Sequence, residues 1–169
     1  MEYVQISKNQ NVYMMLYRNE EYIVSDYRKD LGKIIKDENR IITDGIPALY
    51  LSDKLGRKEG NASAVVLAKT TEEVSSVMKY AYENNIPVTP RGAGTNLVGS
   101  TVPDHGGIIL DVSGMNKIEE FDEDTLSVTV QPGVLLKDVQ AYVEERGLFY
   151  PPDLRRTRAR IVQEEILLQ

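Results

Sequence analysis

The positions of the apolar residues predict short strands and helices from residue 64 onward. Residues 64–68 form a continuous apolar run of strand length. Residues 108–111, three apolar residues followed by an aspartate, predict another strand. Between them lies a segment whose apolar residues follow the spacing i, i+3, i+4, i+7, which predicts a helix with one buried face. The residues on this face are Val74, Val77, Met78 and Ala81. A strand followed by such a helix predicts the start of a βαβ unit.

Polar residues mark both ends of the predicted helix. Thr70 followed by Glu73 is a capping box, and Asn84-Asn85 ends the helix because asparagine tolerates the left-handed conformation. Residues 86–89 then predict a second strand. Since the helix crosses over between the two strands, we expect them to form a parallel pair.

The remaining pattern predicts a hairpin and a second helix. Residues 118–121 and 126–130 alternate apolar and polar positions around the acidic turn 122–124, which we interpret as the solvated end of a hairpin. Apolar residues then recur at helical spacing, and Gly147 is the expected end of that helix. These residues are Leu136, Val139, Tyr142 and Val143. The order β-α-β, loop, β-β-β, α predicts an α+β fold.

The N-terminal part of the chain has a weaker pattern. Residues 1–29 are rich in tyrosine and asparagine without a clear period, and we expect a loosely packed N-terminal arm. From residue 27 to 37 the spacing of Leu31, Ile34 and Ile35 predicts a short helix.

Composition narrows the class of protein. A length of 169 residues fits one domain, and 41% hydrophobic with 27% charged residues excludes a disordered chain. The net charge of -6 argues against a nucleic acid as partner. No apolar run is long enough for a signal core or a transmembrane segment, so we expect a cytoplasmic protein.

The rarity of metal-binding and nucleophilic residues narrows the chemistry. The chain has no cysteine, which excludes disulfides, thiolate metal sites and cysteine nucleophiles. Its single histidine, His105, excludes a multi-histidine zinc site and is expected to be a solvated loop residue. The sequence nominates no metal ligand and no catalytic residue.

The segment from residue 90 to 107 carries the strongest functional signal. Gly92, Gly94 and Gly99 allow the backbone to approach a ligand closely, and successive N–H groups in such a turn bind anions. Neither a P-loop nor a Rossmann fingerprint fits, because no Gly-Lys-Ser/Thr is present and Pro103 disfavours a helix here. From glycine content alone, a mobile surface loop remains the alternative.

Four motifs follow one another along the chain. They are Ile-Pro-Val-Thr-Pro-Arg-Gly-Ala-Gly-Thr-Asn-Leu (86–97), Gly-Gly-Ile-Ile-Leu-Asp (106–111), Val-Gln-Pro-Gly-Val (130–134) and Gly-Leu-Phe-Tyr-Pro-Pro-Asp (147–153). In this order they resemble the FAD-binding domain of FAD-linked oxidases, of the vanillyl-alcohol oxidase and p-cresol methylhydroxylase type. The resemblance covers residues 30–153 and is strongest to the branch that contains glycolate oxidase and D-lactate dehydrogenase.

The resemblance implies the first α+β subdomain of such an FAD-binding domain, a βαβ unit plus a small mixed sheet with flanking helices. It also implies which residues hold FAD, with the first eight on the pyrophosphate, the next two as a wall beside the cofactor and the last near the isoalloxazine ring. They are Arg91, Gly92, Ala93, Gly94, Thr95, Asn96, Gly99, Ser100, Pro132, Gly133 and Pro152.

The resemblance further implies the reaction, which is oxidation of a 2-hydroxy acid such as glycolate or D-lactate by hydride transfer to FAD. Members that attach the flavin covalently commonly carry a histidine where this chain has Thr95, so we expect non-covalent FAD.

The resemblance ends after residue 153. Residues 154–169 form an atypical tail with four arginines and two glutamates. One possible set of codons for its Gln-Glu-Glu-Ile-Leu (163–167) reads Gly-Gly-Asn-Ile in a shifted frame. We therefore expect a frame-shifted fragment that is inactive alone, retains FAD weakly and self-associates. For the tail, the alternative is a genuine basic amphipathic segment, for example a partner-binding helix. For the chain as a whole, one alternative is a non-catalytic module that needs a partner flavoprotein chain. Another is a fragment of a different flavoenzyme on this scaffold, such as an enolpyruvyl-sugar reductase or an ether-lipid synthase.

Overall fold

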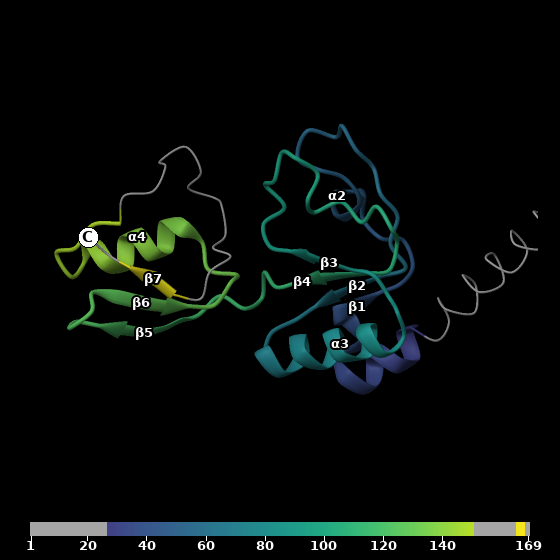
Figure 1. Ribbon diagram of the computed structural model, residues 1–169, viewed down its shortest axis with the longest axis horizontal. Helices are drawn as coiled ribbons and strands as arrows, with labels where there is room; N and C mark the ends of the chain where they lie inside the picture. Colours follow the sequence, from purple (N-terminus) through teal and green to yellow (C-terminus); the bar gives the residue numbers. More distant parts are fainter. Residues whose placement is uncertain (1–26, 151–164, 168–169) are drawn as a thin grey trace, which may run out of the picture.

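The computed structural model describes residues 27–150 and the strand at 165–167, arranged around two sheets (Figure 1). Most of the predicted N-terminal arm, most of the tail and Pro152 lie outside the described residues. The described elements follow the α+β order predicted from the apolar pattern, with a first sheet on residues 41–111 and a second on residues 118–167.

The first sheet has the strand order β1-β2-β4-β3. Its strands are β1 (Ile41–Ile42), β2 (Ala64–Leu67), β3 (Val88–Arg91) and β4 (Ile108–Asp111). Both β2 and β3 run parallel to β4, and β1 pairs antiparallel with β2. The predicted direct pairing of the first two strands of the βαβ unit is therefore wrong, since β4 lies between β2 and β3. All four residues of β4 are buried, as expected for a central strand that is covered on both faces.

Helix α3 (Thr71–Glu83) connects β2 to β3 and begins and ends as predicted. The Thr70 side chain accepts a hydrogen bond from the Glu73 N–H at 3.2 Å. At the other end Asn85 has a φ of 54°, and Ile86 N–H donates to the Ala81 carbonyl, which makes a Schellman motif. One predicted buried position is wrong: Met78 is 46% exposed, because the packed stripe follows Val77 and Ala81.

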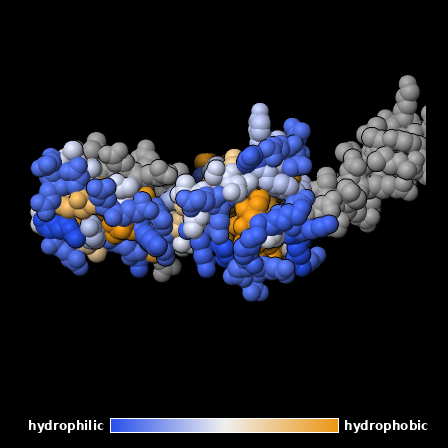
Figure 2. All heavy atoms as spheres, turned by 90° about the horizontal axis from the view of Figure 1, so that it is seen from below, coloured by the Kyte–Doolittle hydropathy of each residue, from blue (hydrophilic) through white to orange (hydrophobic). Residues whose placement is uncertain are grey.

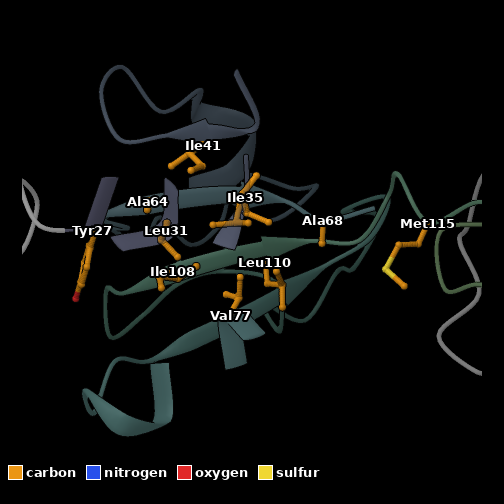
Figure 3. Close-up of a cluster of buried hydrophobic side chains, with 11 residues drawn as sticks. Tyr27, Leu31, Ile35, Ile41, Ala64, Ala68, Val77, Ile108, Leu110 and Met115 are labelled. Atoms are coloured by element: carbon orange, nitrogen blue, oxygen red, sulfur yellow. The ribbon is translucent and has the colours of Figure 1, made fainter. Parts of the chain in front are cut away.

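The first core lies between the sheet, α3 and a helix at 27–34, which ends three residues earlier than predicted. In Figure 3 most of the labelled side chains lie together on the sheet and the helices, and Met115 lies on the loop beyond the strands. The buried members are Tyr27, Leu31, Ile35, Ile41, Ala64, Val66, Ala68, Val77, Ile108, Leu110 and Met115. Seen from below in Figure 2, apolar atoms reach the surface in small areas that hydrophilic side chains surround.

The apolar pattern did not predict three short elements. They are the 3-10 helix η1 (Glu38–Arg40), strand β1 and helix α2 (Ala48–Leu51). Each has four residues or fewer, which is too short to show a period.

The second sheet has the order β5-β6-β7 and carries helix α4 (Leu136–Glu144). The predicted hairpin is present as β5 (Ile118–Asp122) and β6 (Ser127–Val130), paired antiparallel. Leu126 belongs to the turn and not to the strand, since its φ of 52° is left-handed. The buried residues of this second core are Val128, Val130, Val134, Val139 and Val143.

Strand β7 (Glu165–Leu167) comes from the atypical tail and pairs antiparallel with β6. Its register joins Val128 to Ile166. This part of the tail is therefore a strand and not the helix that one alternative required. No helix in the described part of the chain is long and apolar enough to cross a membrane.

An ion pair fixes the start of α3 to the segment before β1. Arg40 donates two hydrogen bonds to Glu73, at 2.8 and 2.6 Å, and a third to the Leu67 carbonyl at 3.1 Å. Glu73 also accepts from the Lys69 N–H at 2.8 Å. Both side chains are largely buried, and the Arg40 guanidinium lowers the pKa of Glu73 from its usual value.

We predict that Glu73→Gln destabilises the protein by about 2 kcal/mol at pH 7, because it leaves the Arg40 charge without its partner. A lowered carboxylate pKa stabilises the fold above the unfolded-state pKa and loses that contribution as pH falls through the folded-state pKa. The difference between wild type and variant in urea unfolding should therefore shrink as the pH falls below about 4.

Glu83→Gln is the matched control, since Glu83 sits on the same helix in an exposed ion pair with Lys79 at 3.9 Å. Its effect should stay below about 0.5 kcal/mol. If Glu73→Gln unfolds at the same urea concentration as the control, the Arg40–Glu73 ion pair does not stabilise the fold as predicted.

Candidate cofactor-binding site

The candidate site lies where three parallel strands end. The register places Leu67 and Arg91 on either side of Asp111, so the last residues of β2, β3 and β4 reach the same level of the sheet. Ligands of open parallel sheets bind outside the carboxyl ends of the strands. The glycine-rich segment leaves β3 at this edge, directly after Arg91.

Arg91 lies beneath the glycine-rich segment as a buried cation. Its residue surface is only 6% exposed, and its guanidinium stands 5.4 Å from the centre of the Tyr50 ring. A Cβ on Gly94 would come within 2.1 Å of Arg91 Nη2, so only glycine leaves room for the guanidinium here. Burial lowers the pKa of Arg91, and the nearby Asp111 and Tyr50 act in the opposite direction.

The buried Asp111 and the half-buried Tyr50 form a hydrogen-bonded pair beside Arg91. The Tyr50 hydroxyl donates to Asp111 Oδ2 at 2.9 Å, and the Ser113 N–H donates to Asp111 Oδ1 at 2.7 Å. Burial, reinforced by the Asp111 charge, raises the pKa of Tyr50 to about 12. Tyr50 therefore stays protonated and keeps donating to the carboxylate at neutral pH.

The glycine-rich segment follows a defined path that its own hydrogen bonds fix. Asn96 Oδ1 accepts from the Val98 N–H at 2.8 Å and from the Ser100 N–H at 3.2 Å. Gly94 and Gly99 have φ values of 63° and 76°. Both lie in the left-handed region, which glycine adopts readily. The side-chain oxygen of Asn96 thus organises the loop, and Ala93, Thr95 and Ser100 face solvent.

Residues 52–61 support this segment from outside. The Lys54 N–H donates to the Asn96 carbonyl at 3.4 Å, and the Asn61 N–H donates to the Pro103 carbonyl at 3.0 Å. Lys58 forms an ion pair with Asp104. The supporting turn is itself closed by the buried Asp53 carboxylate, whose Oδ1 accepts from two N–H groups, those of Leu55 and Arg57.

Two buried side-chain polar atoms of the described residues have no hydrogen-bond partner, Arg91 Nη1 and Thr101 Oγ1. Both belong to the segment in which the sequence places the cofactor. An unpaired buried donor costs about 1–3 kcal/mol, and more when it is charged, so each of these groups needs an explanation, and a bound anion is one that would supply the missing partner. The anion-binding interpretation of this segment fits the residues present.

The two predicted wall residues lie at the joint between the sheets. The Gly133 N–H donates to the Met115 carbonyl at 2.6 Å, and a Cβ on Gly133 would stand 2.4 Å from that oxygen. Gly133 is buried and Pro132 half-buried. The structure thus gives Gly133 a steric reason to be glycine, and its contact with FAD, like that of Pro132, stays a prediction.

The other candidate residues take no part in the site. His105 is exposed in a turn, as expected. In the hairpin turn, Asp122 Oδ1 accepts from the Thr125 and Asp124 N–H groups, which lowers the pKa of Asp122. Within the described residues, no group of three or more histidine, aspartate or glutamate side chains could hold a metal ion.

Three residues of the site were not predicted from the sequence: Tyr50, Asp111 and Thr101. Tyr50 lies 41 positions before Arg91 in a helix of four residues, and no periodicity connects the two. Asp111 belongs to a motif that carried the family resemblance, and its position at the end of a buried strand was the available signal. Thr101 directly follows the predicted Ser100.

The comparison with protein families identifies the class. The profile of the FAD binding domain family matches residues 62–159, more than half of the chain. The chain belongs to this family of FAD-binding domains, and FAD is its cofactor.

Two named relatives each match most of this chain. The chain is 38% identical over 131 residues to glycolate oxidase subunit GlcD of Bacillus subtilis, covering 78% of this chain and 28% of that protein. It is 48% identical over 122 residues to D-lactate dehydrogenase of Anaerostipes hadrus, covering 72% and 26%. The chain thus spans about a quarter of the length of these relatives.

Solved structures confirm the fold. The chain is similar to p-cresol methylhydroxylase with a TM-score of 0.68 at 24% identity, over 83% of this chain and 28% of that one. It is also similar to an alkyldihydroxyacetonephosphate synthase, with a TM-score of 0.65 at 18% identity over 79% and 30%. These likenesses confirm the predicted p-cresol methylhydroxylase-type fold.

We predict that Gly94→Ala weakens FAD binding about tenfold or more, because the new methyl group displaces the Arg91 guanidinium. Gly45→Ala is the matched control: Gly45 has nearly the same φ, 61° against 63°, but a Cβ added there would meet nothing within 4 Å. Both variants should lose about 1 kcal/mol of stability from backbone strain. FAD titration should separate them, and equal affinities would contradict the role of Gly94.

Proposed function

We propose that this chain is the pyrophosphate-binding part of an FAD-dependent oxidoreductase that oxidises a 2-hydroxy acid. One observation carries the proposal: both unpaired buried polar side chains of the described residues, Arg91 and Thr101, lie in the glycine-rich segment at the carboxyl ends of the strands. The family match covers this segment, and FAD carries a pyrophosphate that supplies the acceptors these donors lack.

The role of the chain in this proposal is to bind and orient the cofactor. Arg91 offers a fixed cation, and the loop from Gly92 to Asn96, with Gly99 and Ser100, offers N–H groups and hydroxyls to phosphate oxygens. Bound FAD supplies the oxidising chemistry by accepting a hydride from the carbon that bears the hydroxyl group. Pro132, Gly133 and Pro152 would flank the cofactor farther along.

The names of the relatives support the substrate class. They include D-lactate dehydrogenases, D-2-hydroxyglutarate dehydrogenases and part of a glycolate oxidase, all named for 2-hydroxy acids. Because the chain matches about a quarter of such proteins, we place the groups that hold the substrate and take its proton outside the aligned region. We therefore expect weak retention of FAD and no turnover by this chain alone.

A second candidate function is a module that binds FAD together with a partner flavoprotein chain. The pairing of β7 with β6 argues against this candidate. Strand β7 of the same chain occupies the edge of β6 to which a strand of a partner could otherwise bind. A fragment of an enzyme with different chemistry is the third candidate, and the alkyldihydroxyacetonephosphate synthases share the fold.

The proposal is tested by titrating the protein with FAD, FMN and riboflavin and following flavin fluorescence. We predict that affinity falls in that order, as phosphate groups are removed. Arg91→Gln should weaken FAD binding about tenfold to a hundredfold and leave riboflavin binding unchanged, since hydrogen bonds to charged groups contribute about 1.5–3 kcal/mol.

Arg146→Gln is the control for loss of a positive charge, because Arg146 stacks on Tyr142 beside the second sheet. Circular dichroism and urea unfolding verify that both variants fold. The proposal is wrong if Arg91→Gln and Arg146→Gln bind FAD equally, or if riboflavin binds as tightly as FAD.

The absence of a histidine at position 95 generates a separate prediction. With Thr95 in that exposed position, FAD should bind without a covalent bond. Protein incubated with FAD, precipitated with acid and separated on a denaturing gel should show no flavin fluorescence in its band. Thr95→His is the informative companion variant, and fluorescence in the wild-type band would refute the prediction.

A further inference from the structure

We propose that Tyr50 is a positioning residue for the cofactor site: its hydroxyl occupies the Asp111 carboxylate and its ring supports the Arg91 guanidinium, so that Arg91 keeps a hydrogen-bond donor free for a phosphate oxygen. The inference rests on the proposed function, and it names a residue outside the span matched by the FAD binding domain family.

The arrangement of Arg91 and Asp111 requires an explanation. The two residues are direct partners in the register of β3 and β4, and both are buried, at 6% and 5% exposure. Opposite buried charges on neighbouring strands normally pair, since an unpaired buried charge is costly. Yet within the described residues Arg91 makes no ion pair with Asp111, and its Nη1 has no partner.

The hydrogen bonds of Asp111 supply the explanation. Oδ2 accepts from the Tyr50 hydroxyl and Oδ1 from the Ser113 N–H, so each carboxylate oxygen already has a short, well-formed bond. A carboxylate held by two donors keeps its orientation and does not turn toward the guanidinium. Tyr50 thus prevents an internal ion pair that would consume the donors of Arg91.

The ring of Tyr50 performs the complementary task. It lies 5.4 Å from the guanidinium carbon and stabilises the cation through its π face. An interaction of this kind uses none of the five N–H donors of arginine, whereas an ion pair uses one or two. The cation is therefore partly compensated in charge, while its hydrogen-bonding capacity remains available to an anion.

The placement of Tyr50 fits this role. The residue lies in α2, which follows Pro47 and packs its tyrosine over the face of the sheet opposite the first core, where Arg91 and Asp111 also point. Leu49, its neighbour in α2, is 60% exposed, while Tyr50 and Leu51 are half-buried. The helix thus brings the Tyr50 side chain to the site.

The test compares FAD affinity in four variants. Tyr50→Phe keeps the ring and loses the hydroxyl, so it frees Asp111 Oδ2 to pair with Arg91 and should weaken FAD binding about tenfold. Adding Asp111→Asn to Tyr50→Phe removes the competing charge and should restore most of the affinity. Tyr50→Leu loses ring and hydroxyl and should bind more weakly than Tyr50→Phe. Tyr82→Phe, on the exposed face of α3, should bind as wild type.

A tyrosinate titration shows whether the contact exists in solution. Absorbance should reveal a tyrosine that ionises with a pKa of about 12, and Tyr50→Phe should lose that step while Tyr82→Phe keeps it. Loss of the step together with recovery of affinity in the double variant supports a positioning role, because a purely structural defect would not be repaired by a second substitution.

The outcomes separate this inference from the proposed function. If Arg91→Gln weakens FAD binding and Tyr50→Phe does not, the inference fails and the proposed function stands. If Tyr50→Phe weakens binding and Asp111→Asn fails to restore it, Tyr50 is only structural and the inference is overturned. If Arg91→Gln has no effect, the proposed function fails first.

Discussion

Burying the Arg91 guanidinium at the end of β3 constrains the structure around it. A buried cation costs several kcal/mol unless its surroundings compensate it, and here the compensation comes from the Tyr50 ring and the nearby Asp111 carboxylate. Gly94 leaves free the space that the guanidinium occupies, and its φ of 63° is a second reason for glycine at this position. The arginine below the glycine-rich loop thus helps to shape that loop.

The sheet topology places the neighbour of Arg91. With β4 between β2 and β3, Asp111 lies directly opposite Arg91, and the face of the sheet away from α3 carries alternate residues of both strands. Helix α2 reaches that face through the hydrogen bond of Tyr50 to Asp111, and residues 52–61 reach the glycine-rich segment through backbone hydrogen bonds. Helix α2 and residues 52–61 therefore belong to the candidate site, although they precede the family match.

What could be predicted from the sequence follows a clear physical division. Strands with continuous apolar runs, the capped helix α3 and the hairpin were predictable because their signals are local: Thr70 caps with Glu73 three positions on, and Asn85 supplies the left-handed residue. The neighbour of β2 was not predictable, since pairing of β2 with β4 depends on where a long loop returns the chain. The glycine-rich segment could be nominated from the sequence as a candidate anion site, but Tyr50 could not, because its relation to Arg91 exists only in three dimensions. Met78 shows the remaining limit: apolar spacing marks the side of a helix that can be buried, and the neighbouring sheet decides how much of it is.

Pro132 and Gly133, two further residues predicted from the sequence, lie at the joint between the two sheets. Gly133 follows β6 and lies against the Met115 carbonyl, which belongs to the turn after β4 and whose side chain closes the first core. Any larger residue at 133 would push the turn after β6 away from the end of β4, which is also the strand that carries Asp111. The distance between the anion site and the turn at Pro132 is therefore set by backbone contact and not by flexible side chains. In the proposed function FAD would reach from the glycine-rich segment to Pro132, and the contact of Gly133 with the Met115 carbonyl would keep the separation between these two parts of the chain constant.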